Sequence, residues 1–216
     1  MSKPDQARRR PPLWFRVSIA MGNSVQLATA GSGVMLLHKA GLEKAGARRR
    51  MSKMLGGWLA IYVSTHAIAH WLVGRAVGIR FRAYGVRGTD HPHVYPPGVS
   101  QIMSILPLFT AITDKRSLRD ATPRARAAML VAGQASTTLC SALAALYAHR
   151  IGTRYSRRFT HVIAAYTACL ALVTAIAPEG DFARARAVLR AARDSGRDEA
   201  LPRSGPQRVG ERSGEG

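Results

Sequence analysis

Four stretches of this chain contain no aspartate, glutamate, lysine or arginine, and segments rich in basic residues separate them. They are residues 17–37, 55–74, 127–148 and 159–178, and each is 20 to 22 residues long. A helix needs about 20 mostly apolar residues to cross a hydrocarbon core about 30 Å thick. This pattern predicts an all-α membrane protein, a bundle of about four transmembrane or re-entrant helices.

The four stretches differ in how apolar they are. The third and fourth are rich in Ala, Leu, Val and Ile, and the second has Trp58, Tyr62 and Trp71 near its ends, as a belt of interfacial aromatic residues would. The first is diluted by small and polar residues and predicts only a weak helix. It fits a small-residue helix packed on others, a re-entrant segment, an amphipathic surface helix, or a signal peptide that ends in Ala-Thr-Ala at residues 28–30.

The segments around these stretches complete the predicted organisation. Residues 1–12 are expected to be a disordered basic N-terminus, and residues 13–54 to hold the weak first helix and a basic loop. Residues 55–190 are expected to form the membrane domain, and residues 191–216 a disordered C-terminal tail, because the tail is polar and rich in Gly, Ser, Pro and Arg.

Shorter patterns inside the membrane domain predict further elements. Residues 79–86 alternate between apolar and polar side chains, which predicts a short β element after the second helix. Residues 99–113 are uncharged but too short to span, and Pro107 interrupts them, which favours a buried or re-entrant segment. Thr122-Pro123 is a typical start for the third helix, a basic turn makes the third and fourth helices a hairpin, and residues 184–193 predict a short basic amphipathic helix.

The charge of the chain changes what its partners can be. A formal charge of +20, from 32 Lys+Arg against 12 Asp+Glu, indicates either nucleic acid or an anionic membrane surface. The cations lie between the apolar stretches and are not interleaved with aromatic residues, so the expected partner is a lipid bilayer with anionic headgroups and no nucleic acid. The expected location is the cell membrane, with several passes. Because every loop is basic, the charge distribution leaves the orientation open.

Two histidines in the second stretch are the strongest candidates for chemistry. His66 and His70 are four residues apart, so a helix places both imidazoles on one face, within reach of one metal ion. Ionisable residues inside a membrane span usually face the bundle interior and mark function. The alternative is a pair of neutral imidazoles that hydrogen-bond to neighbouring helices. His91 and His93 form a second candidate, either for metal binding or as part of a polar turn.

The sequence around this pair resembles the site-2 protease family of intramembrane zinc metalloproteases. In that family an HExxH helix is followed by a glycine-containing turn and a small β-structure, as His66 to His70 are here followed by Gly74, Gly78 and the alternating segment. Thr122-Pro123-Arg124 and Ala132-Gly133-Gln134-Ala135 are similar to the family's next helix and its Ala-Gly-Pro segment. Pro178-Glu179-Gly180-Asp181-Phe182-Ala183-Arg184 stands where the family has Pro-x-Asp-Gly-Gly-Arg. The resemblance covers roughly residues 55–190.

The resemblance implies a metal site and also shows what is missing from it. It implies zinc as the possible cofactor, with His66, His70 and Asp181 as ligands. The family's catalytic glutamate is replaced by Ala67, which can neither accept nor donate a proton. Glu179 belongs to a different segment and is a poor substitute for it. Gln134 replaces a proline of the family pattern, and Thr137 is the nearest residue to an asparagine that is absent.

Three hypotheses about function follow. The first is a non-proteolytic relative of the site-2 proteases, a pseudoenzyme that keeps the helix bundle and the zinc site and binds transmembrane segments of other proteins. The second is an active membrane metalloprotease or other hydrolase that uses a different base. The third is a structural membrane protein without a metal, because a fold does not by itself determine a function. The sequence favours the first, since the ligand pattern is present and the base is absent.

Overall fold

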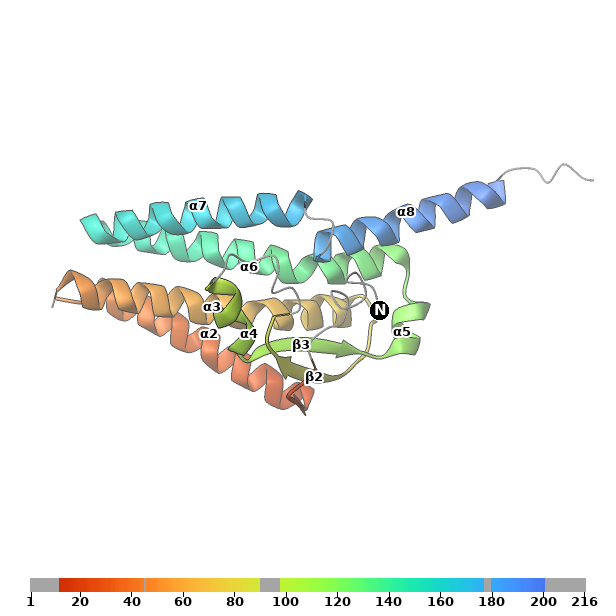
Figure 1. Ribbon diagram of the computed structural model, residues 1–216, viewed down its shortest axis with the longest axis horizontal. Coiled ribbons are helices and arrows are strands. Elements are labelled where there is room, and N and C mark those ends of the chain that lie inside the picture. Colours follow the sequence, from red (N-terminus) through yellow and green to blue (C-terminus); the bar gives the residue numbers. More distant parts are fainter. Residues whose placement is uncertain (1–11, 45, 90–97, 177–179, 201–216) are drawn as a thin grey trace, which may run out of the picture.

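A computed structural model describes residues 12–44, 46–89, 98–176 and 180–200. Most of this part is helical. Four long helices run side by side along the longest axis of the molecule: α2 (Ile19–Gly41), α3 (Ala47–Ala76), α6 (Pro123–Ile151) and α7 (Arg154–Ile176) (Figure 1). A fifth, α8 (Asp181–Ala200), lies beside the first half of α6 and extends past its beginning. The mostly helical bundle therefore agrees with the predicted fold class.

Two segments of the described chain are long and apolar enough to cross a membrane. They are α6, Pro123–Ile151, and Arg154–Ser195, which begins with α7. The sequence pattern predicted about four such helices. Helices α2 and α3 are as long as membrane helices, but α2 is diluted by small and polar residues, and α3 begins with three consecutive arginines. Composition alone therefore supports membrane crossing for two of the four long helices.

Helix α2 corresponds to the weak first stretch, and small residues explain how it packs. At the crossing of α2 and α3, a Cβ on Gly33 would lie 2.6 Å from the carbonyl oxygen of Gly57, and a Cβ on Gly57 would lie 2.7 Å from the oxygen of Gly33. The two backbones can approach this closely only because both residues are glycine. Among the alternatives for this stretch, the structure supports a small-residue helix packed on a neighbour.

The basic loop predicted before the second helix is much shorter than expected. Helix α2 continues to Gly41 and α3 already begins at Ala47, so most of the predicted loop is helical. Lysine and arginine are good helix formers, so a run of charges does not end a helix in the way that glycine or proline does. The side chains of Lys53 and Arg50 bond back to Glu43 and hold the remaining connection against the first turns of α3.

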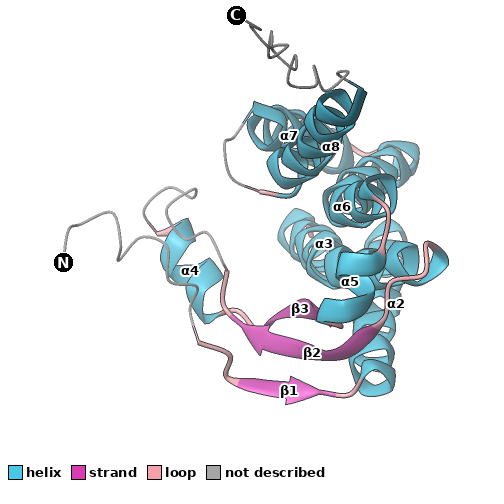
Figure 2. Cartoon of the chain, turned by 90° about the vertical axis from the view of Figure 1, so that its right-hand side faces the viewer, coloured by secondary structure: helices cyan, strands magenta, loops and turns pink. Residues whose placement is uncertain are grey.

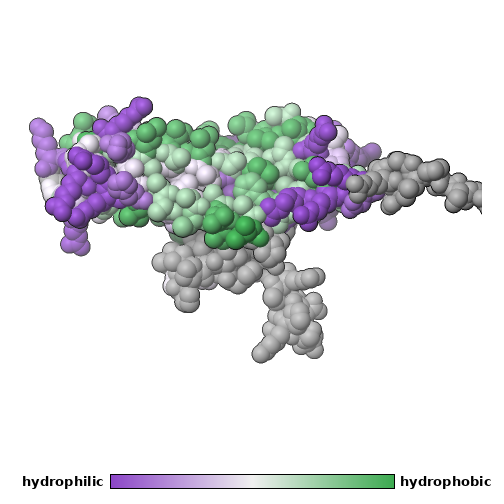
Figure 3. All heavy atoms as spheres, turned by 90° about the horizontal axis from the view of Figure 1, so that it is seen from above, coloured by the Kyte–Doolittle hydropathy of each residue, from purple (hydrophilic) through white to green (hydrophobic). Residues whose placement is uncertain are grey.

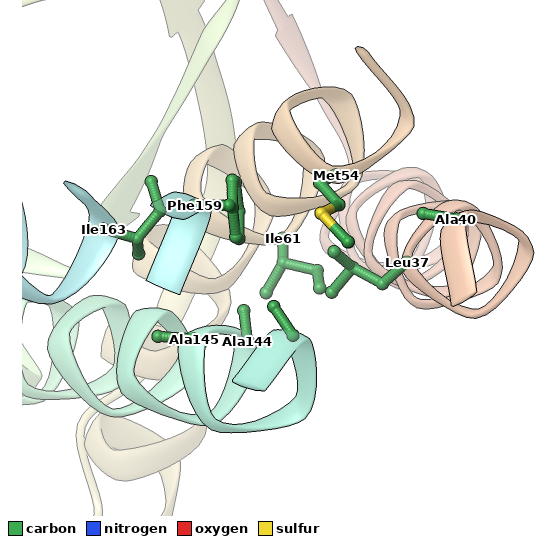
Figure 4. Close-up of a cluster of buried hydrophobic side chains, with 9 residues drawn as sticks. Leu37, Ala40, Met54, Ile61, Ala144, Ala145, Phe159 and Ile163 are labelled. Atoms are coloured by element: carbon green, nitrogen blue, oxygen red, sulfur yellow. The ribbon is translucent and has the colours of Figure 1, made fainter. Parts of the chain in front are cut away.

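The core lies where the four long helices meet. It combines large side chains from α2, α3 and α7 with alanines from α6, which let the helices pack closely (Figure 4). Its buried members are Leu37, Ala40, Met54, Ile61, Ala144, Ala145, Ala148, Phe159 and Ile163. Helices α6 and α7 are joined by a turn at Gly152, which has a positive φ of 75° and ends α6, so the predicted hairpin is confirmed.

A three-stranded antiparallel sheet covers one side of α2 and α3 (Figure 2). Its order is β1 (Phe15–Val17), β2 (Phe81–Arg87) and β3 (Leu108–Thr113). The central strand β2 confirms the β element predicted after the second helix. The side chain of Tyr84 on this strand is fully buried against Gly22 of α2 and donates a 2.8 Å hydrogen bond to Asn23. This contact anchors the sheet to α2.

Two further predictions need correction. Residues 99–113 were expected to be one buried or re-entrant segment, but they form α4 (Val99–Ile105) and the strand β3, separated at Pro107, where a helix cannot easily continue. Residues 191–200 were expected to be disordered, but they continue α8, because the alanines and arginines there are strong helix formers. The remaining short helix, α5 (Lys115–Asp120), is capped by Asp114. Residues 1–11 and 201–216 lie outside the described part.

Candidate metal centre

The candidate centre lies between facing sides of α3 and α6. Along α3, Trp58, His66 and His70 contact α6, and they are spaced by eight and by four residues. Along α6, the residues that meet them are four apart and run in the opposite direction: Ser141, Thr137, Gly133 and Met129. Residues four apart lie on the same face of a helix, so the two antiparallel helices bring these rows together.

His70 is held by the backbone of α6. Its Nδ1 lies 2.6 Å from the carbonyl oxygen of Met129, an acceptor, so Nδ1 carries the proton and donates it. The ring lies directly against Gly133, where an added Cβ would come within 2.7 Å of two ring carbons. Gly133 therefore makes room for the imidazole, and the Nε2 atom of His70 points away from Met129.

His66 is held by a side chain of the same helix. Its Nδ1 lies 3.3 Å from the hydroxyl oxygen of Thr137, and that hydroxyl donates its own hydrogen to the carbonyl oxygen of Gly133 at 2.9 Å. With its hydrogen engaged there, the Thr137 oxygen accepts from His66. The proton of this imidazole is therefore also on Nδ1, and Nε2 carries a free lone pair.

Asp181 approaches the two histidines from a third helix. It is the first residue of α8 and follows Gly180, whose positive φ of 118° turns the chain into that helix. Its Oδ2 atom lies 3.3 Å from Nε2 of His70 and 3.5 Å from Nε2 of His66. The side chains of His70 and Asp181 are largely buried, with 15% and 18% of their surface exposed, and that of His66 is 39% exposed.

In the neutral tautomers that these hydrogen bonds favour, three electron-pair donors converge. The two Nε2 atoms are 3.2 Å apart, and the carboxylate oxygen completes the triangle. Such atoms repel one another unless a proton or a cation lies among them, and a single divalent ion would satisfy all three. Zinc forms tetrahedral bonds of about 2.0–2.1 Å to these atoms, which places neighbouring ligands about 3.3–3.4 Å apart. The observed separations of 3.2, 3.3 and 3.5 Å fit this geometry.

The group formed by His66, His70 and Asp181 could therefore hold a metal ion. Comparisons with known proteins add nothing to this conclusion. No protein-family model, curated protein or solved structure matches the chain. The interpretation of the centre thus rests on its own geometry and on the chemistry of its ligands.

The position beside His66 is closed to solvent. Ala67 is only 2% exposed, so its methyl group is packed against protein rather than directed into an open cleft. A longer side chain at this position would have to displace its neighbours. Among the described residues, no carboxylate other than Asp181 forms a hydrogen bond or ion pair with either histidine. Glu179, His91 and His93 lie outside the described residues.

The sequence predicts the three candidate ligands but not the groups that orient them. Thr137 enters the sequence pattern only as the nearest residue to an absent asparagine, and the Met129 carbonyl has no sequence signature. The α6 residues that meet α3 are four apart but differ in type, so their spacing gives no signal in the sequence. Gln134, next to Gly133, is buried, and its side-chain nitrogen has no acceptor among the described residues.

Proposed function

We propose that this protein is a multi-pass membrane protein that binds one zinc ion between α3, α6 and α8 and does not cleave peptides. The observation that carries the proposal is the triangle formed by Nε2 of His66, Nε2 of His70 and Oδ2 of Asp181, with both Nδ1 protons directed elsewhere. Two histidines and one carboxylate are a common ligand set for zinc.

The surface of the bundle supports a membrane location. Large apolar side chains are exposed along the flanks of all four long helices, among them Leu27, Leu59, Leu139 and Leu172. Figure 3 shows an apolar middle region between two polar ends. Soluble proteins rarely expose apolar surface on this scale. A helix rises about 1.5 Å per residue, so even the shortest of the four, with 23 residues, is about 34 Å long and can cross a bilayer.

The two ends of the bundle are suited to anionic headgroups. At one end, the connection between α2 and α3 lies beside the turn between α6 and α7. Nearly all the charged residues of these two connections are cations: Lys39, Lys44, Arg48, Arg49, Arg50, Lys53, Arg150, Arg154, Arg157 and Arg158. The other end carries the arginines of α5, α8 and the start of α6. Clustered cations beside a membrane helix attract anionic lipids.

The chain supplies metal ligands without the group that would use a metal for peptide hydrolysis. Bound zinc would act as a Lewis acid and lower the pKa of a coordinated water molecule. Peptide cleavage additionally needs a residue that takes a proton from water and delivers it to the leaving amine, and such acid–base catalysis contributes roughly 10²–10⁴-fold. Ala67 stands in that place. The site is thus suited to joining α3 and α8 rather than to proteolysis.

Metal analysis of the purified full-length protein tests the proposal. We expect one zinc per chain in the wild type and in His161→Ala, a control that removes an exposed histidine outside the centre. We expect the zinc to be lost when His66 and His70 are both replaced by Ala. Incubated with a membrane-embedded peptide, the zinc-loaded wild type should release no cleavage product.

Two results would contradict the proposal in different ways. A folded wild-type sample without stoichiometric metal would exclude the zinc site and favour the structural membrane protein. Cleavage that a chelator abolishes would favour an active hydrolase that uses a different base.

A further inference from the structure

The three candidate ligands neutralise only part of the positive charge that a zinc ion would bring to the centre. Two neutral imidazoles contribute no charge, and Asp181 contributes the single carboxylate. Asp181 is also the first residue of α8, so the positive end of that helix dipole lies at the same place. The side chains of His70 and Asp181 are largely buried, where uncompensated charge costs free energy. The fourth ligand of the metal is therefore expected to be an anion.

Arg184 adds a further positive charge beside the centre. It follows Asp181 by three residues on α8, and residues three apart lie on one face of a helix with their Cβ atoms about 5–6 Å apart. Its side chain is partly buried, and its charge acts on the imidazole of His70. The next arginine, Arg186, is directed elsewhere, because it donates to the carbonyl oxygen of Ala175 in α7. Of these two arginines, Arg184 is the one at the centre.

A metal ion and a guanidinium side by side favour an anion with two oxygens. A zinc ion with three protein ligands keeps one position open, which accepts one oxygen atom. The planar guanidinium of arginine donates two parallel hydrogen bonds and matches the geometry of a carboxylate. A hydroxide or chloride ion would occupy the metal position without using the guanidinium. The combination with Arg184 therefore points to a carboxylate.

The surface next to His66 restricts the rest of such a ligand. The side chain of His66 is more exposed than those of the other two ligands, so a fourth ligand can enter on its side. On the same face of α3, Tyr62 lies one turn before His66 and Leu59 two turns before it, and Leu59 is exposed. The exposed ring of Tyr166 in α7 packs against Tyr62. This surface is suited to an apolar body.

We propose that the metal centre binds a carboxylate on an apolar body, with one carboxylate oxygen on the metal and the other accepting from Arg184. This inference rests on the proposed zinc site and names its fourth ligand. Two sources of such a group are a free fatty acid and the C-terminal carboxylate of an apolar peptide.

Cobalt in place of zinc tests the inference, because cobalt(II) absorbs visible light and its spectrum changes when a ligand enters. The cobalt-loaded full-length protein in a neutral detergent is titrated with decanoate, with a short apolar peptide that has a free C-terminal carboxylate, and with the neutral decanamide. We expect a carboxylate to change the spectrum at one molecule per metal, and decanamide to leave it unchanged. The carboxylate that binds more tightly identifies the source.

Substitutions of Arg184 separate its role from that of the metal ligands. Arg184→Gln should still bind cobalt but bind the carboxylate roughly 10–100-fold more weakly, because charge-assisted hydrogen bonds are the strong ones. Arg184→Lys keeps the charge but not the fork of donors, so it should lose less. Arg190→Gln, which removes an exposed charge further along α8, should bind the carboxylate as the wild type does.

The possible failures of the inference and of the zinc site are distinct. Equal carboxylate affinity of Arg184→Gln and the wild type, or a cobalt spectrum that neither carboxylate changes, would overturn the inference while the metal site stands. A folded wild type that takes up neither zinc nor cobalt would overturn the proposed function itself.

Discussion

At the scale of single residues, the candidate centre depends on where two protons lie. The Met129 carbonyl and the Thr137 hydroxyl each accept from one imidazole Nδ1, which leaves both Nε2 lone pairs facing Asp181. Partners of this kind fix the tautomer of a ligating histidine and the direction of its ring. The two partners differ in one respect: a backbone carbonyl cannot be removed by mutation, whereas the threonine hydroxyl can.

Replacing Thr137 with valine should therefore weaken metal binding without altering any ligand. We expect zinc affinity to fall about 10–100-fold, because His66 loses the acceptor that directs its lone pair into the site. Thr137→Ser, which keeps the hydroxyl, should bind zinc nearly as the wild type does. Competition with a chelator of known affinity measures the change.

Thr167→Val provides a matched control for this substitution. Thr167 is also buried in a long helix, and its hydroxyl bonds to the carbonyl of Ile163 in that helix. The control should leave zinc affinity unchanged. If Thr137→Val bound zinc as tightly as the wild type, the orienting role of Thr137 would be wrong.

At the scale of elements, α3 is the central helix of the bundle, and its faces carry different chemistry. Gly57 faces α2, where the contact is between two backbones, and the histidines face α6, where the contact is polar. The C-terminal end meets the sheet, where Gly74 leaves room for the ring of Phe81. Close packing on several sides holds α3 in one rotation, and this rotation directs His66 and His70 toward Asp181.

The glycine contact between α2 and α3 can be tested with two substitutions in the same helix. Gly33→Ala places a Cβ against the Gly57 carbonyl and the Ile61 side chain, and we expect it to destabilise the protein by about 1–3 kcal/mol through overpacking. Gly31→Ala points into open space and should be neutral, or stabilise by up to about 1 kcal/mol, because alanine favours helix. Unfolding in detergent measures both. Equal effects would show that the close approach is not needed.

The contact between α2 and the sheet has a pH dependence that can be measured. Burial raises the pKa of the Tyr84 phenol to about 12, above its ordinary value of 10.0. The folded protein therefore holds this proton more tightly than the unfolded chain does. The resulting stability is fully present below about pH 10 and is lost as the pH rises from there through about 12.

Ultraviolet absorbance of tyrosinate follows this ionisation directly. We expect one tyrosine of the folded protein to ionise near pH 12, and this step to disappear in Tyr84→Phe. If Tyr84→Phe removed absorbance from the step near pH 10 instead, Tyr84 would be more exposed to water than its packing against Gly22 and Asn23 indicates.

At the scale of the whole molecule, the connections between the long helices lie at two opposite ends of the bundle. The connection from α2 to α3 and the turn from α6 to α7 lie at one end, where Gly41 packs on Ile151 and His38 bonds to Tyr147. The sheet, α5 and α8 lie toward the other end (Figure 1). If the long axis crosses the bilayer, the metal centre lies closer to this second end, since His70 is near the end of α3.

This arrangement predicts a definite topology. In a chain whose natural cysteines, Cys140 and Cys169, have been replaced, Lys44→Cys and Arg154→Cys should react with a membrane-impermeant thiol reagent from the same side of a sealed vesicle. Lys115→Cys should react from the opposite side. Labelling of Lys44→Cys and Arg154→Cys from different sides would contradict a four-helix crossing. Such labelling also decides the orientation, which the basic loops leave open because both ends are positively charged.

Local chemistry explains what the sequence by itself determined. Features that act within one or two turns of backbone can be identified without knowing the fold. They include the uncharged runs, the Thr122 cap, Gly78 before a strand, and the four-residue spacing of His66 and His70. Composition could not determine the partner of α2, which depends on the close approach at Gly33, or the pairing of β3 with β2. Tertiary structure also decided which atoms meet at the centre. The groups that meet the histidines come from two other helices: Asp181 from α8, and Thr137 and the Met129 carbonyl from α6. Only the packing of these helices brings the two Nε2 atoms and the Asp181 carboxylate together and directs the two Nδ1 protons away from them.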